Sequence, residues 1–122
     1  MKNAVLISFA AVGAVMASPA YAADGFAACM AMSKQVGRSF FAEPVAADQS
    51  KTDALGMQFG QFLRENGHTV DVYTPKDAPP AELTVDCRWH ATKEGAAAWR
   101  DQVMPGLEAR GFRAMRLVFK PR

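Results

Sequence analysis

The chain has few of the residues that carry enzyme chemistry. Its 122 residues include two cysteines and two histidines. No Cys-x-x-Cys, His-Glu-x-x-His, Gly-x-Ser-x-Gly or glycine-rich phosphate loop occurs. A thioredoxin-type redox site, a dedicated zinc site, a hydrolase nucleophile and a nucleotide-phosphate site are therefore unsupported. We predict no metal, no cofactor and no enzymatic activity.

Strong charge and long apolar runs are also missing. The formal net charge is +2, whereas a nucleic-acid partner usually requires a far more basic surface. The longest uncharged apolar stretch covers residues 4–17, which is shorter than the ~20 residues that span a bilayer. With 50% hydrophobic and 21% charged residues, the composition is that of one folded domain.

The N-terminus has the organisation of a secretory signal peptide. Lys2 precedes the apolar stretch, Pro19 ends it, and Ala20-x-Ala22 offers the small side chains that signal peptidase accepts. Cleavage after Ala22 leaves a single domain of 100 residues, 23–122, with a net charge of +1 and no other segment able to span a membrane. We therefore expect a protein exported to the periplasm or beyond it.

Both cysteines, Cys29 and Cys87, remain after this cleavage. Thiols pair in the oxidising compartments that exported proteins reach, so we predict one disulfide between them. In the chain-entropy model, a disulfide that closes the loop between these two cysteines stabilises the fold by roughly 4 kcal/mol.

Hydrophobic periodicity predicts the elements of the first half of this domain. The small apolar segment 23–33 favours a short helix, and 36–41 favours a strand. An apolar stripe with helical spacing predicts a helix from about Ser50 to the Asn66-Gly67 stop. The alternating segment 69–73 indicates a short strand.

The second half carries the clearest strand pattern. Residues 82–90 alternate, with Leu83, Val85, Cys87 and Trp89 on one face, which predicts one buried and one solvated face. Thr92 is placed to cap a helix over 93–110, Gly111 to end it, and 112–119 to form the last strand. The order β-α-β-β-α-β predicts an α+β, ferredoxin-like sandwich, with two helices on one face of a four-stranded antiparallel sheet.

The segment from Cys87 through Thr92 and Ala96 to Arg100-Asp101 resembles small exported bacterial proteins of unknown function. In these, a strand cysteine leads into a Thr-capped, alanine-rich helix (Cys-x4-Thr-x3-Ala). The same segment is also similar to the second half of the sporulation-related repeat (SPOR) domain, although Arg38-Ser39-Phe40-Phe41 stands where SPOR domains have a Gln-Val-Gly-Phe-like start. The SPOR resemblance implies binding to peptidoglycan glycan strands that lack stem peptides.

The predicted solvated sheet face supplies the candidate binding residues Arg88, His90 and Arg116. Along one strand Asp86 and His90 are about 13 Å apart, too far for a direct catalytic dyad. We therefore expect a non-catalytic binding or accessory module of the cell envelope. The alternatives are a small periplasmic enzyme that uses His90 with a group from a neighbouring strand, and a protein-binding inhibitor or partner.

Charge is divided unevenly along the domain. Residues 23–87 carry 5 basic and 9 acidic groups, whereas residues 88–122 carry 8 basic and 3 acidic groups. The basic last third either binds an anionic envelope component or pairs with the acidic first part across the fold. The sequence leaves both alternatives open.

Overall fold

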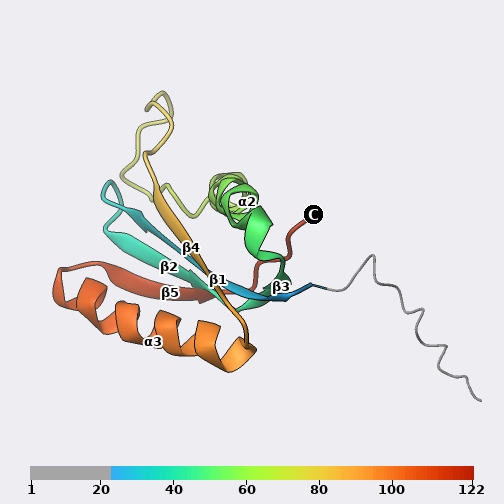
Figure 1. Cartoon of the computed structure of the whole chain (residues 1–122). Coiled ribbons are helices and arrows are strands. Elements are labelled where there is room, and N and C mark those ends of the chain that lie inside the picture. The colour runs from blue at the N-terminus through green and yellow to red at the C-terminus, as the bar shows by residue number, and fades with distance from the viewer. Residues whose placement is uncertain (1–22) are drawn as a thin grey trace, which may run out of the picture.

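The described part of the chain alternates short strands with two helices. The computed structural model describes residues 23–122, so the predicted signal peptide, residues 1–22, lies outside the described residues (Figure 1). The elements in chain order are β1 (Gly25–Ser33), β2 (Arg38–Ala42), β3 (Val45–Ala47), the 3-10 turn η3 (Gln49–Lys51), α2 (Thr52–Glu65), β4 (Thr84–His90), α3 (Lys93–Ala109) and β5 (Arg113–Leu117).

β1 is the central strand of a mixed five-stranded sheet. β4 pairs antiparallel with one edge of β1, and β2 and β3 pair antiparallel with its other edge. Phe41 lies opposite Met30, and Val45 lies opposite Ala27. Between these two pairs the β2–β3 segment therefore has one residue more than β1, as in a β-bulge. β5 adds parallel to β2 at the far edge.

The prediction of a helix at residues 23–33 is wrong, because this segment forms β1. Ala27, Ala28 and Ala31 are completely buried, and almost every residue of the strand is buried on one face or the other. A strand covered on both faces lacks the alternation that identifies a half-buried strand. Its run of small apolar residues cannot be told from a buried helical segment by periodicity.

α2 covers one face of the sheet. Its apolar stripe of Leu55, Phe59 and Leu63 is buried, as the periodicity predicts. The stripe packs against the side chains that β1 and β2 direct to this face, which are Ala27, Cys29, Ala31, Phe40 and Ala42.

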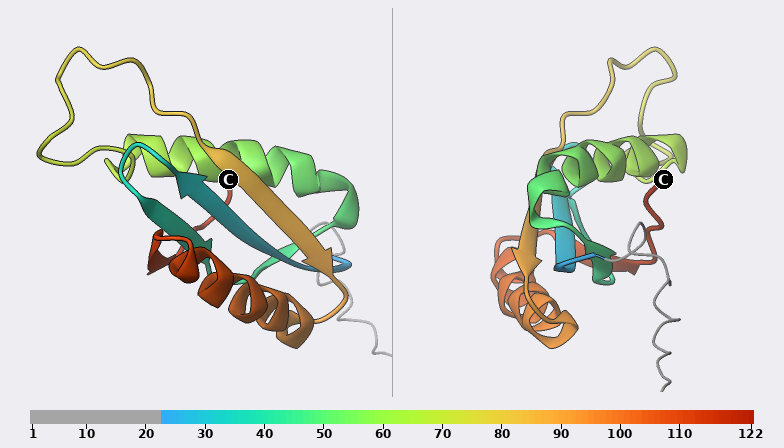
Figure 2. Two further views of the ribbon diagram at one scale, coloured as in Figure 1. Left: turned by 90° about the vertical axis from the view of Figure 1, so that its left-hand side faces the viewer. Right: turned by 45° about the vertical axis from the view of Figure 1, so that its right-hand side comes forward.

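α3 covers the opposite face (Figure 2). Leu107 of this helix forms a second buried cluster with Met30 and Phe41, whose neighbours along the strands face α2. The α+β class is therefore confirmed, but the ferredoxin-like arrangement is wrong: the sheet is mixed, and the helices lie on both of its faces. The face that the alternation of β4 predicted to be open is covered by α3.

Local signals at the helix ends are confirmed. The Thr92 side chain accepts a 3.0 Å hydrogen bond from the Gly95 N–H at the start of α3. Gly67 and Gly111 follow the ends of α2 and α3 with φ values of 73° and 94°, a left-handed conformation that glycine adopts without a steric penalty.

A long connection, residues 66–83, joins α2 to β4 and projects from the body of the domain (Figure 2). The predicted strand at 69–73 is wrong, because these residues form turns within this connection. Connections of this length without regular structure are uncommon in small domains, where they are usually functional loops or linker segments.

The predicted disulfide is confirmed. Cys29 and Cys87 are direct cross-strand partners on β1 and β4, with their Cα atoms 4.0 Å apart. The bond joins segments that are 58 residues apart in the sequence. Among residues 23–122, no helix has the length and apolar character needed to cross a bilayer.

Removing this bond should destabilise the domain without changing its fold. We expect the Cys29→Ala/Cys87→Ala variant to lose about 4 kcal/mol of unfolding free energy, because its unfolded chain is no longer cross-linked. For a domain of this size that loss lowers Tm by roughly 15–30 °C in a calorimetric scan. Wild-type protein reduced with dithiothreitol is the control for lost packing, and an unchanged Tm in both samples would contradict the prediction.

Candidate functional site

Two of the predicted binding residues, Arg88 and His90, lie beside Trp99 of α3. β4 directs both side chains towards α3, where the Arg88 guanidinium carbon lies 5.6 Å from the centroid of the Trp99 ring. The His90 ring centroid lies 6.5 Å from the same ring. Arg88 also pairs with Asp86 at 3.2 Å, and its side chain is 59% exposed. The cation–π contact and the ion pair hold the Arg88 head group at the rim of the domain.

The third predicted residue, Arg116, belongs to a different part of the surface. It lies on β5, and β1 and β2 separate β5 from β4. Three strand spacings amount to about 14 Å. Arg116 instead approaches Asp101 of α3, with 3.6 Å between Nη2 and Oδ1. The structure therefore does not bring Arg88, His90 and Arg116 together into one site.

Arg100 is a buried charged residue that the sequence analysis missed. Its side chain is 7% exposed, donates from Nη1 to Glu43 Oε2 at 2.6 Å and from Nε to Asp101 Oδ1 at 3.0 Å. The Glu43 carboxylate lies at the bend between β2 and β3, so this pair ties α3 to the bulge. Position 100 falls on the apolar stripe of α3, four residues after Ala96. This helical spacing is the feature of the sequence that indicates burial of Arg100.

The basic last third of the chain pairs partly with the acidic first part. Arg100 reaches Glu43, and Arg122 Nη2 lies 3.4 Å from Glu65 Oε1. Arg116 finds its carboxylate within the last third instead. Ion pairing across the fold therefore accounts for two of the basic side chains and leaves others, such as the exposed Arg110 and Arg113, directed to solvent.

The histidines have surroundings that favour packing over proton transfer. His90 Nδ1 is buried and has no hydrogen-bond partner among the described residues. His68 lies against the rings of Phe40 and Phe62, with centroid distances of 5.8 and 6.2 Å. Within residues 23–122, no three His, Cys, Asp or Glu side chains converge as metal ligands would.

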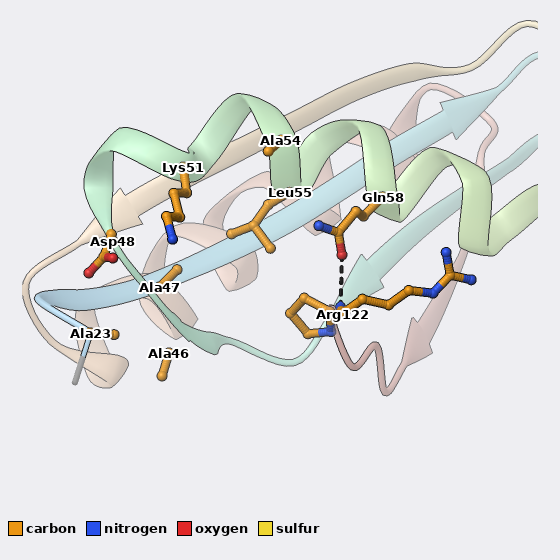
Figure 3. A pocket seen from close by; sticks show the side chains of 10 residues that line it. Ala23, Ala46, Ala47, Asp48, Lys51, Ala54, Leu55, Gln58 and Arg122 are labelled. Carbon is orange, nitrogen blue, oxygen red and sulfur yellow. Dashed lines mark hydrogen bonds between the residues drawn. The ribbon is translucent and has the colours of Figure 1, made fainter. Parts of the chain in front are cut away.

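A hollow of about 360 Å³ opens beside the first turns of α2 (Figure 3). Small and apolar side chains, among them Ala47 and Leu55, form much of its wall, and Asp48, Lys51 and Gln58 supply polar groups. Gln58 Oε1 accepts a 2.9 Å hydrogen bond from the Arg122 backbone N–H, which holds the C-terminal segment against α2 (Figure 3). The hollow therefore has a structural use in docking that segment.

The tip of the 66–83 connection is an ordered turn with exposed apolar side chains. Asp71 Oδ1 accepts hydrogen bonds from the Tyr73 N–H at 2.9 Å and from the Thr74 hydroxyl at 3.1 Å. The Thr74 N–H donates to the Asp71 carbonyl at 3.1 Å. Between them, Val72 is 90% and Tyr73 is 88% exposed. We call residues 71–74 the Asp71–Thr74 turn.

Two arginines hold this connection to the body of the domain. Arg38 of β2 donates from Nη1 to the carbonyls of His68 and Val70, at 3.1 and 3.4 Å. Arg64 of α2 donates from Nη2 to the Ala81 carbonyl at 3.2 Å. The connection is thus tied near both ends, and these contacts restrict the orientations of the turn.

No known protein family, curated protein or solved structure matches the chain significantly. The resemblances to small exported proteins and to the SPOR domain therefore stay predictions. Among the large apolar side chains of residues 23–122, Val72 and Tyr73 in the Asp71–Thr74 turn are the most exposed.

The contacts of Arg38 predict the effect of removing it. We expect Arg38→Ala to free the start of the connection, because the His68 and Val70 carbonyls lose their donor, at a cost of about 1–2 kcal/mol. Amide hydrogen exchange at Tyr73 and Thr74 should then accelerate, while exchange in β1 stays slow. Arg113→Ala on the exposed side of β5 is the matched control, and equal exchange in both variants would contradict the role of Arg38.

Proposed function

We propose that this chain is an exported, non-catalytic binding module of the bacterial cell envelope that contacts another exported protein through the Asp71–Thr74 turn. The observation that carries the proposal is the combination of order and exposure at that turn. Large apolar side chains that project from a fixed backbone lose little conformational entropy on binding, and tyrosine is enriched in protein interfaces.

Export is supported by the N-terminal sequence and by the disulfide. The N-terminal pattern of charge, apolar run and Ala20-x-Ala22 is that of a signal peptide. Asp24, near the start of the described residues 23–122, is anchored to the domain: its Oδ1 accepts from Trp89 Nε1 and from the Gln49 N–H, both at 3.0 Å. The Cys29–Cys87 bond fits an oxidising compartment.

A non-catalytic role is supported by the surroundings of His90. His90, the residue that the enzyme alternative needs, lies against Trp99, and its buried Nδ1 has no hydrogen-bond partner among residues 23–122 that could orient it. A general base usually requires such an orienting partner together with access to substrate. Packing of β4 against α3 is the role that these contacts favour.

A peptidoglycan glycan is a second candidate partner, and the observation that favours it is the Arg88–Trp99 contact. An exposed guanidinium held over an aromatic ring offers hydrogen-bond donors beside an apolar surface. This combination suits a polar, partly anionic polymer, whereas the Asp71–Thr74 turn suits an apolar protein surface.

The protein partner is tested with the Val72→Ser/Tyr73→Ser variant. Immobilised wild-type protein should retain a specific envelope protein from cells that produce the chain, and the variant should bind the purified partner at least tenfold more weakly, as expected for interface anchors. Val118→Ser, which removes a 67% exposed side chain elsewhere, is the matched control.

Three results of this experiment are informative. Loss of binding in the turn variant alone supports the proposal. Equal affinity of all three proteins contradicts it. Retention on purified sacculi that survives in the turn variant but is lost in Arg88→Ala would replace the protein partner with the glycan.

A further inference from the structure

We propose that β4 is also a homodimerisation edge, and that two copies of the chain pair antiparallel through β4 about a two-fold axis at Cys87. Among residues 23–122, β4 pairs with β1 alone, and no strand pairs with its outer edge along any of the seven residues. Figure 2 shows no further strand beside this edge, and α2 runs alongside β4. An open strand edge is a template for a further strand, and closed two-fold pairing is the commonest way in which identical chains satisfy it.

The backbone of β4 determines which residues can pair. Directly opposed residues of antiparallel strands have Cα atoms about 5.5 Å apart in a hydrogen-bonded pair and about 4.5 Å apart in a non-hydrogen-bonded pair. Cys29 and Cys87 are 4.0 Å apart and thus form a non-hydrogen-bonded pair. The N–H and carbonyl groups of Cys87 therefore point away from β1, and by alternation so do those of Val85 and Trp89.

Charge then selects one register. An axis at Asp86 would oppose two carboxylates, and an axis at Arg88 would oppose two guanidinium groups, and both arrangements are unfavourable. An axis at Cys87 places Asp86 opposite the Arg88 of the second copy, twice in each dimer. The same axis places Val85 of one copy opposite Trp89 of the second copy. Pairs of an aromatic and a β-branched residue stabilise sheets.

The helix above β4 adds an apolar contact near the same axis. Gly56 of α2 lies over Cys87, since a Cβ added to this glycine would come within 3.9 Å of Sγ. The next residue, Met57, is 78% exposed. A groove of about 480 Å³ runs between α2 and β4, and its wall includes Met57, Gly60, Val85 and Cys87. Two-fold pairing at Cys87 brings the Met57 side chains of the two copies to this groove.

Charge exchange tests both the dimer and its register. In sedimentation experiments over a wide concentration range, wild-type protein should associate reversibly. Asp86→Arg and Arg88→Asp should each weaken association at least tenfold, because each creates two like-charge contacts. The double variant Asp86→Arg/Arg88→Asp should recover association to within about threefold, because the pairs re-form with exchanged signs.

Glu108→Arg and Arg110→Asp make the same charge changes at exposed positions at the end of α3 and should dimerise like wild type. Thermal unfolding checks that every variant is folded, and a non-reducing gel checks that the dimer is not covalent. The turn variant Val72→Ser/Tyr73→Ser should still dimerise, so failure of this inference and failure of the proposed function are distinguishable.

Hydrogen exchange provides an independent measurement of the same edge. The amides of Val85, Cys87 and Trp89 should become protected as protein concentration rises, whereas those of Asp86 and Arg88 already bond to β1. A protein that stays monomeric at every concentration overturns the proposal. So does association that either single charge change leaves intact, or that the double variant fails to restore.

Discussion

Burial of β1 on both faces is the constraint on which the rest of the structure depends. A helix can approach each side of this strand closely because Ala27, Ala28 and Ala31 present little side-chain volume. α2 then packs on the face that carries Cys29, and α3 on the face that carries Met30. Every other strand except β5 is held by direct pairing with β1, so the sheet has one structural centre. The disulfide reinforces this centre where β4 joins it, and Arg100 reinforces the other side through Glu43.

The same constraint explains how much of the fold the sequence could predict. The two helices, β2, β4 and β5 follow from local signals: an apolar stripe in α2, strict alternation in β4, and a capping threonine before α3. β1 could not be recognised, because burial on both faces removes the alternation and leaves a run of small residues. The topology depends on β1 too. With a helix predicted at residues 23–33, the remaining elements fit a different strand order, with one sheet face left open.

The candidate site was predictable to a smaller extent. Arg88 and His90 lie on the face of β4 that the alternation assigned to them, but a polar face of an edge strand can be partly covered by a helix when long side chains keep their charged ends in water. Residues 69–73 alternate like a strand. Among residues 23–122 they pair with no strand, and the hydrogen bonds of Asp71 with Tyr73 and Thr74 turn the chain instead. The contacts of Arg38 and Arg64, which come from distant parts of the sequence, tie this connection to the domain.

Both proposed surfaces belong to β4 and to the connection that precedes it, and this has a geometric consequence. The connection enters β4 at Thr84, three residues before Cys87. In a two-fold antiparallel pair the first residue of one β4 lies beside the last residue of the other, so the two Asp71–Thr74 turns lie at opposite ends of the joined strands. A dimer of this kind presents its turns in opposite directions and can therefore link two partner molecules. Bivalent attachment to a single small partner requires both contacts to be reached at once, which this arrangement does not allow.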